Sequence, residues 1–167
     1  MKHLKLFFAL FAMLALGVGN AWAETYTGDF VKITSVNELT TGYYVIVASE
    51  SASANSYAVG STVNSNKRID GVAVTIVNDK ITNPDNKIVY YITKVGSKYT
   101  FQNVNTSQYL YQASTTSGKG MGFYASSKEI TCAGYNTTDP IGFKFTLDGA
   151  SNNFFKWNTP SYKVGFS

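Results

Sequence analysis

Short apolar runs separated by polar turns make up the chain from Thr25 onward. Within each run, β-branched and aromatic residues alternate with polar ones, and no apolar repeat at helical spacing extends beyond one turn, at Asn37–Leu39. Alternation of this kind is typical of strands. The predicted strands are Phe30–Thr34, Tyr43–Ser49, Ser56–Gly60, Val72–Val77, Ile88–Lys94, Tyr99–Val104, Gln108–Ala113, Met121–Tyr124, Glu129–Ala133, Phe143–Leu147, Asn153–Asn158 and Tyr162–Phe166.

Turn residues separate these strands at close intervals. Val95–Lys98 contains Gly96 between two aromatic strands, which predicts a tight hairpin with a positive φ at the glycine. Asp148–Gly149 and Pro160 mark further turns. No segment has the length and composition of an interdomain linker, so residues 24–167 are predicted to form one all-β domain.

A weak threefold repeat indicates how the strands are arranged. Aromatic pairs at Tyr43–Tyr44, Tyr99–Phe101 and Phe154–Phe155 each open a strand, at offsets of 56 and 55 residues, and each is followed by a second aromatic strand. The spacing favours a small closed barrel of the β-trefoil type, in which three units each contribute such a hairpin. Another antiparallel barrel or a β-sandwich is the alternative.

The first 23 residues have the organisation of a secretory signal peptide. Lys2 and Lys5 precede an apolar run from Leu6 to Val18, and Ala21-Trp22-Ala23 supplies the small residues of a cleavage site. The apolar run is shorter than the roughly 20 residues that a membrane-spanning helix needs. We therefore predict cleavage between Ala23 and Glu24, export to the periplasm, cell surface or medium, and no membrane insertion afterwards. An uncleaved N-terminal anchor is the alternative.

Composition excludes several classes of protein. The only histidine, His3, lies in the predicted leader, so cleavage removes the imidazole that Ser-His-Asp catalysis, Cys-His catalysis or a histidine-liganded zinc site requires. The leader holds two of the 14 basic residues, leaving 12 against 10 acidic ones, a formal charge of +2. Lys67–Arg68 is the only basic pair, which does not fit a nucleic-acid binder.

The remaining polar groups predict no catalytic site, metal or cofactor. The carboxylates are scattered in turns and do not suggest a glycosidase pair. The Asn and Asp residues of segment 78–86 lack the order of a calcium loop. Cys132, the only cysteine, lies in a predicted strand and is expected to pack as a small apolar residue.

Aromatic residues supply the candidate binding chemistry, since 12 tyrosines are present. Alternation places Tyr109 and Tyr111 on one face of their strand and Leu110 on the other, so either the tyrosine pair or Leu110 points outward. Exposed Tyr and Trp offer a flat apolar face and a polar tip to sugars or peptides. The candidate ligand-binding residues are Arg68, Tyr111, Trp157, Asn158 and Tyr162.

The order of short apolar segments also carries a resemblance to a known family. These segments are Phe30–Ser35, Glu38–Leu39, Gly42, Tyr44–Val47, Ala58–Gly60, Val72–Val77 and Phe155–Asn158. Over residues 30–166 their order resembles a β-rich accessory module of secreted Bacteroidetes proteins. The resemblance implies an exported accessory part and carries no catalytic residue.

The chain departs from that module at its C-terminus. In the module a further strand follows the aromatic segment and helps to close the sheet, whereas this sequence stops at Ser167. Either the domain closes differently or the sequence is a fragment that lacks its last strand. We expect Phe30–Thr34 to be the strand left short of a partner, with its edge open to pairing.

These observations predict a secreted, non-catalytic recognition module. Its ligand is a glycan or a protein outside the cell, bound through exposed aromatic residues and loops. The alternative is a structural or adhesion subunit of a bacterial surface assembly, in which an exposed strand edge pairs with another copy or another protein by β-strand addition. A hydrolase that relies on carboxylates alone is the third hypothesis.

Overall fold

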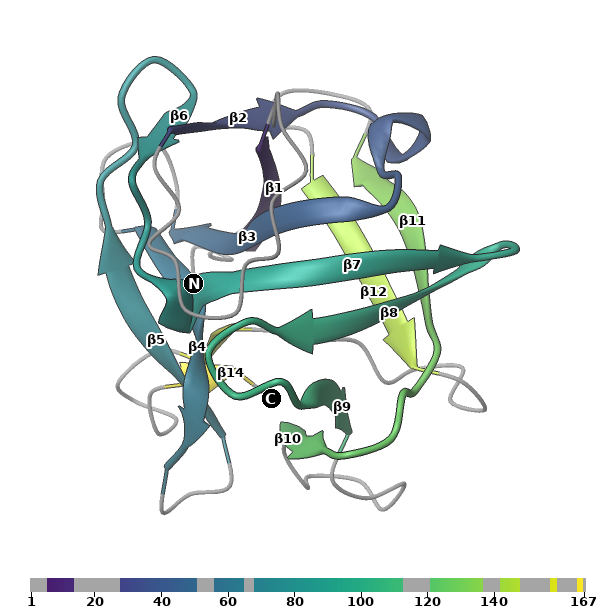
Figure 1. Cartoon of the computed structure of the whole chain (residues 1–167). Helices are drawn as coiled ribbons and strands as arrows, with labels where there is room; N and C mark the ends of the chain where they lie inside the picture. The colour runs from purple at the N-terminus through teal and green to yellow at the C-terminus, as the bar shows by residue number, and fades with distance from the viewer. Residues whose placement is uncertain are drawn as a thin grey trace, which may run out of the picture.

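Antiparallel β-strands form almost all of the structure (Figure 1). The computed structural model describes residues 6–13, 28–50, 56–64, 68–112, 121–136, 142–147, 157–158 and 165–166. The strands are β1 (Leu6–Met13), β2 (Asp29–Ile33), β3 (Gly42–Glu50), β4 (Ser56–Val63), β5 (Ile69–Val74), β6 (Lys80–Thr82), β7 (Val89–Val95), β8 (Lys98–Asn103), β9 (Tyr109–Gln112), β10 (Met121–Tyr124), β11 (Ile130–Asn136), β12 (Gly142–Leu147), β13 (Trp157–Asn158) and β14 (Gly165–Phe166). Two 3-10 turns, η1 (Val36–Glu38) and η3 (Asn86–Ile88), interrupt them. The predicted all-β class is confirmed, and none of these residues belongs to a helix able to cross a membrane.

The strands pair into one branched sheet. Its main path runs β10-β9-β8-β7-β3-β4-β5-β14-β13. Two branches leave this path. In one, β11 pairs with β8 and with β12. In the other, β1 pairs with β3 and with β2, and β2 also pairs with β6. Over the described strands the path ends at β10 and β13 without returning on itself. The expected closed barrel is therefore not found, because central strands change partners along their length and the sheet branches there.

Two strands lie where the sequence did not predict any. β1 falls within the predicted leader, and β6 falls in a segment that resembles a polar turn. Asn78 and Asp79 both have a positive φ, of 51° and 57°, and Val77 bridges to Lys80 across them. This is the backbone of a tight hairpin, which Asn and Asp tolerate better than most residues.

The expectation that Phe30–Thr34 lacks a partner is wrong for the chain as described. β2 pairs with β1 on one side, where Phe30 lies opposite Met13. On its other side it pairs with β6, where Phe30 lies opposite Ile81. The partner on the first side could not be anticipated, because it comes from the predicted leader.

Apolar residues pack on both faces of β3. The main cluster consists of Ile33, Leu39, Tyr44, Ile46, Ala48, Val59, Ile69, Tyr90, Ile92, Tyr99, Phe101, Leu110, Met121, Ile130 and Cys132. The second cluster consists of Phe30, Val45, Val47, Ala58, Ile81, Ile88 and Val89. Alternate residues of β3 enter different clusters, which explains why the strand is an unbroken apolar run.

Tyr90 brings a hydroxyl group into the main cluster. That hydroxyl donates a hydrogen bond to the backbone carbonyl of Gly60, at 2.5 Å. Burial raises the pKa of Tyr90 well above its ordinary value, so the phenol stays neutral and remains a donor. A Cβ at Gly60 would lie 2.7 Å from the backbone oxygen of Asp70, which restricts this position of β4 to glycine.

Cys132 packs as the sequence predicts. It belongs to the main cluster, is only 8% exposed and forms no disulfide. Burial raises the pKa of the Cys132 thiol to about 12, because the thiolate would lose its hydration there. The thiol therefore has neither the charge nor the access that a nucleophile needs.

A native protein at about pH 8 is expected to resist alkylation of Cys132, since only the thiolate reacts. Mass spectrometry after exposure to iodoacetamide checks this, with the same reaction in urea as the control. Labelling should appear only in the unfolded sample. Rapid, complete labelling of the folded protein would contradict the burial of this side chain.

Candidate ligand-binding face

Four tyrosines and one glutamine form a row across five neighbouring strands. Pairwise register aligns Tyr43 with Tyr91, Tyr91 with Gln102, Gln102 with Tyr109, and Tyr109 with Tyr124. Directly opposed residues of antiparallel strands point to the same face of the sheet, so all five side chains share one face. Each is half-buried. We call these residues the tyrosine row.

Ring contacts connect members of the row with their neighbours. The ring centroids of Tyr43 and Tyr91 are 4.9 Å apart, with the planes tilted by 53°. At the other end, the ring of Tyr111 meets that of Tyr124 edge to face, with centroids 6.4 Å apart. Such pairs restrict one another's rotamers. Tyr43 also packs against the second cluster, so each of these half-buried rings has only part of its surface open to a ligand.

The glutamine of the row is held by the turn between β8 and β9. Gln102 Nε2 donates to the backbone carbonyl of Ser107, at 3.0 Å. Asn103, fully buried, organises the same turn: its Oδ1 accepts from the backbone N–H of Thr106 at 3.1 Å, and its Nδ2 donates to the carbonyl of Lys87 at 3.0 Å. These bonds set the position at which Tyr109 enters β9.

The four predicted ligand contacts that the structure describes do not lie in one ladder. Tyr111 lies on β9, beside the tyrosine row. Leu110 is 2% exposed in the main cluster, and Tyr111 is half-buried with its side chain packed against the same cluster. Arg68 precedes β5, while Trp157 and Asn158 form β13, at the opposite end of the main strand path. There, Phe166 of β14 pairs with both Ile69 and Trp157. Tyr162 lies outside the described residues.

The tyrosine row could be predicted only in part from the sequence. Alternation within a strand tells which residues share its face, and it separates Tyr43 from Tyr44 and Tyr109 from Leu110. Which residues of neighbouring strands stand opposite one another depends on register. Register follows from tertiary packing as well as from local turns, and the strand pattern did not specify it.

Each acidic side chain that the structure describes has a polar partner close by. The pairs are Asp29 with Lys80 (3.0 Å), Glu38 with Thr34 (3.1 Å), Asp70 with Thr62 (2.8 Å), Asp79 with Lys32 (3.7 Å), Asp85 with Lys87 (4.0 Å) and Glu129 with Lys98 (3.2 Å). In the described part of the chain, no three His, Cys, Asp or Glu residues gather into a group that could hold a metal ion. The Asn and Asp residues of segment 78–86 instead form turns there.

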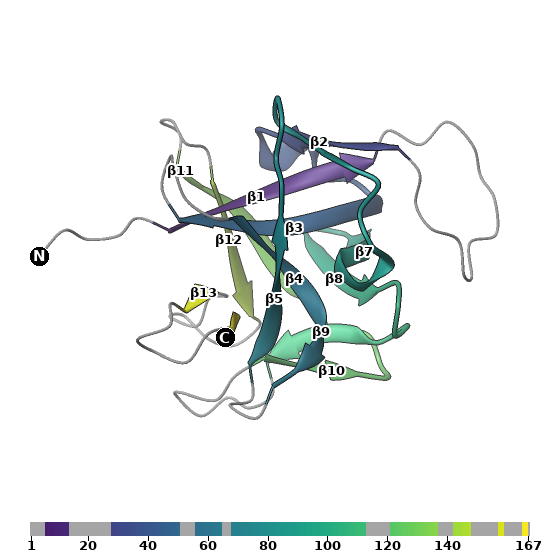
Figure 2. The ribbon, with the colours of Figure 1, turned by 90° about the vertical axis from the view of Figure 1, so that its left-hand side faces the viewer.

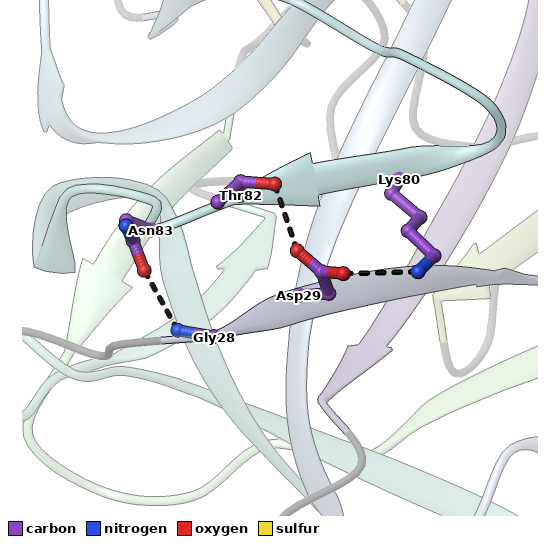
Figure 3. Close-up of polar contacts among 5 residues, drawn as sticks. All are labelled: Gly28, Asp29, Lys80, Thr82 and Asn83. Atoms are coloured by element: carbon purple, nitrogen blue, oxygen red, sulfur yellow. Dashed lines mark hydrogen bonds and ion pairs between the residues drawn. The ribbon is translucent and has the colours of Figure 1, made fainter.

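Asp29 is the centre of the densest of these polar contacts (Figure 3). Its carboxylate accepts hydrogen bonds from Lys80 Nζ at 3.0 Å and from Thr82 Oγ1 at 2.8 Å, both on β6. Beside it, Asn83 Oδ1 accepts from the backbone N–H of Gly28 at 2.7 Å, and the N–H of Asn83 donates back to the Gly28 carbonyl at 2.9 Å. These contacts attach the start of β2 to β6.

The hydrogen bonds from Lys80 and then Thr82 lower the pKa of Asp29 from its ordinary value of 3.8. A lowered pKa means that the carboxylate stabilises the fold above about pH 3.8 and that this contribution disappears as the pH falls through the lower value. Carbon NMR of the Asp29 carboxyl should therefore show a midpoint below 3.8. Lys80→Gln and Thr82→Val should each move the midpoint upward, and an unchanged midpoint in both variants would contradict the assigned cause.

Comparison of the chain with models of protein families, with curated proteins and with solved structures finds no match in any of the three. The chain's own residues are therefore the basis for a proposed function.

Proposed function

We propose that the protein is an exported, non-catalytic recognition module that binds a glycan along the tyrosine row. The observation that carries this proposal is the alignment of Tyr43, Tyr91, Gln102, Tyr109 and Tyr124 on one face of five consecutive strands. Strands lie roughly 4.8 Å apart, so the row extends over roughly 19 Å, enough for several sugar units of an extended chain.

The chemistry of the row favours a neutral glycan. A pyranose ring has apolar C–H faces and polar edges, which match the flat face and hydroxyl tip of tyrosine. An amide between the rings adds donors and acceptors for sugar hydroxyls. The row contains no acidic or basic residue, so it offers no ion-pair partner to an acidic or basic ligand.

Other parts of this proposal rest on the sequence. The apolar segment after Lys5 and the Ala21-Trp22-Ala23 site support export. The order of segments in residues 30–166 supports an accessory module like those of secreted Bacteroidetes proteins.

Removal of the Tyr91 ring is expected to weaken glycan binding by about 5- to 30-fold, or roughly 1–2 kcal/mol, because Tyr91 lies between Tyr43 and Gln102 in the row. The protein is screened on a glycan array, and the strongest oligosaccharide is titrated by calorimetry against the wild type and Tyr91→Ala. A protein that binds no glycan in the array would refute the proposal.

Two further variants separate binding from folding. Tyr91→Phe keeps the ring and should retain most of the affinity, whereas Tyr109→Ala should lose it as Tyr91→Ala does. Thermal unfolding of each variant shows whether the fold is intact. Equal affinity for the wild type and both alanine variants would place the ligand elsewhere, and selective binding of peptides in place of sugars would change the ligand class.

A further inference from the structure

The predicted leader supplies a strand in the middle of the sheet. β1 lies between β2 and β3 and pairs antiparallel with both (Figure 2). Leu10 stands opposite Ile33 of β2 and also opposite Ile46 of β3. Cleavage after Ala23 would remove all of β1 and leave the two strands on either side of it in place.

Loss of β1 would uncover one whole edge of β3. The other edge is shared by β7, along Gly42–Val45, and β4, along Val47–Ser49. Among the described strands, β1 alone pairs with the edge from Tyr44 to Glu50. Residues of this stretch, such as Val45 and Val47, are 0% exposed, so their backbone groups would lose their partners deep in the fold. Buried N–H and C=O groups without partners are strongly unfavourable.

β2 has attachments that do not depend on β1. Asp29 binds Lys80 and Thr82 on β6, and Gly28 exchanges two hydrogen bonds with Asn83 (Figure 3). Phe30 is 0% exposed and packs in the second cluster. These contacts hold β2 at a distance from β3, with the width of one strand between them.

Direct pairing of β2 with β3 would not close this gap. Both strands are antiparallel to β1, so they run parallel to one another. Residues 34–41 alone connect them, whereas a parallel crossover needs about a dozen residues or more. Leu39, in that connection, is 0% exposed in the main cluster, which further restricts its movement.

We propose that, once the leader is removed, the space between Phe30–Ile33 of β2 and Tyr44–Glu50 of β3 accepts an extended apolar segment from another polypeptide chain. We call this space the β1 slot. The proposal rests on the predicted leader cleavage and is independent of the tyrosine row. The incoming strand runs antiparallel to both neighbours and forms backbone hydrogen bonds with each, which is β-strand addition to two edges at once.

The residues around the β1 slot define the partner's chemistry. A residue in the position of Leu10 is in register with Ile33 and Ile46, which belong to the main cluster. Its neighbour, in the position of Ala9, is in register with Val47 of the second cluster. Both faces of the incoming strand therefore require apolar residues, and a charge near its centre would be buried. The partner segment is about eight residues long, uncharged and free of proline, as β1 itself is.

To test whether the β1 slot accepts a separate peptide, a protease site is inserted after Gly19 in the full chain. After cutting, the folded protein is briefly exposed to mild urea and a fluorescent peptide of residues 2–16, then returned to buffer. The peptide should replace the chain's own segment, one per protein, and restore the unfolding temperature of the uncut chain. The same peptide with Leu10→Pro should bind at least about tenfold more weakly, since proline removes a ladder donor.

Two results would overturn the proposal at this step. In the first, the protein freed of residues 1–19 unfolds at the same temperature as the uncut chain and takes up no peptide. In the second, the protein freed of residues 1–19 loses its fold and remains unfolded when the peptide is added. The N-terminus of protein exported by its host is the second measurement. If the exported protein retains residues 1–23, β1 occupies the slot permanently and the proposal is wrong. Glycan binding by the uncut chain reports separately on the tyrosine row.

Discussion

Replacing Asn103 with alanine is expected to lower the free energy of unfolding by about 2–4 kcal/mol. The side chain is fully buried. It accepts hydrogen bonds from the N–H and hydroxyl of Thr106, donates one to the carbonyl of Lys87, and is also hydrogen-bonded to the Tyr90 hydroxyl. Alanine removes all of these bonds and leaves the backbone groups of Thr106 and Lys87 without these partners. Urea denaturation followed by far-UV circular dichroism measures the change.

Gln102→Ala is the matched control for Asn103→Ala. Gln102 is the adjacent residue, is half-buried and makes one described side-chain hydrogen bond, to the Ser107 carbonyl. We expect its replacement to cost about 1 kcal/mol or less. A larger loss for Gln102→Ala than for Asn103→Ala would contradict the assignment of Asn103 as the residue that organises the turn.

The same substitution should affect the proposed binding face. Asn103 fixes the turn from which β9 begins, and Tyr109 is the first residue of that strand. A disordered turn would misplace Tyr109 relative to Gln102, its partner in the row. Asn103→Ala is therefore expected to weaken glycan binding even in conditions in which the rest of the protein remains folded.

Local patterns were sufficient to predict most of the strands. Met121–Tyr124 was predicted with the bounds it has, and the hairpin at Val95–Lys98 contains Gly96 at φ 61°. These elements depend on alternation and on turn residues, both of which act over a few positions. The same reasoning placed Cys132 in a strand and in the core, as observed.

Partner choice between strands could not be predicted from such patterns. β8 pairs with β11 at Tyr99 and with β9 at Gln102, and this change of partner makes the sheet branch where a closed barrel was expected. Alternation within β8 is compatible with either arrangement. Which arrangement forms depends on contacts between residues far apart in the chain, as with the main cluster.

In the candidate site, too, local patterns predicted single residues but not which strands lie side by side. Tyr111 was selected from its own strand and lies at the binding face, in contact with Tyr124. Tyr43 and Tyr91 were not selected, since nothing in either strand alone indicates that their rings lie 4.9 Å apart. Tyrosine is intermediate in its tendency to be buried, so a single tyrosine in a strand does not indicate a binding face, and the row is recognised only when five strands are aligned.

Leu10→Pro in the full, uncut chain is expected to destabilise the protein by roughly 3 kcal/mol, the cost of proline within a hydrogen-bonded helix. Leu10 stands opposite Ile33 on one side and Ile46 on the other, so β1 is a central strand at this point. Proline lacks the N–H donor, and its ring does not fit between two paired neighbours. Thermal and urea unfolding of the full chain measure the loss.

Leu10→Val separates the backbone effect from the loss of the leucine side chain. Valine keeps the N–H and favours strands, so this variant should lose much less stability than the proline variant. If both variants have the same thermal and urea unfolding midpoints as the wild type, residues 6–13 do not contribute to the stability of the folded domain. The backbone groups at that edge of β3 must then have other hydrogen-bond partners. A loss confined to Leu10→Pro means that the domain depends on a hydrogen-bonded strand at this position. This dependence is the premise of the proposed β-strand addition at the β1 slot.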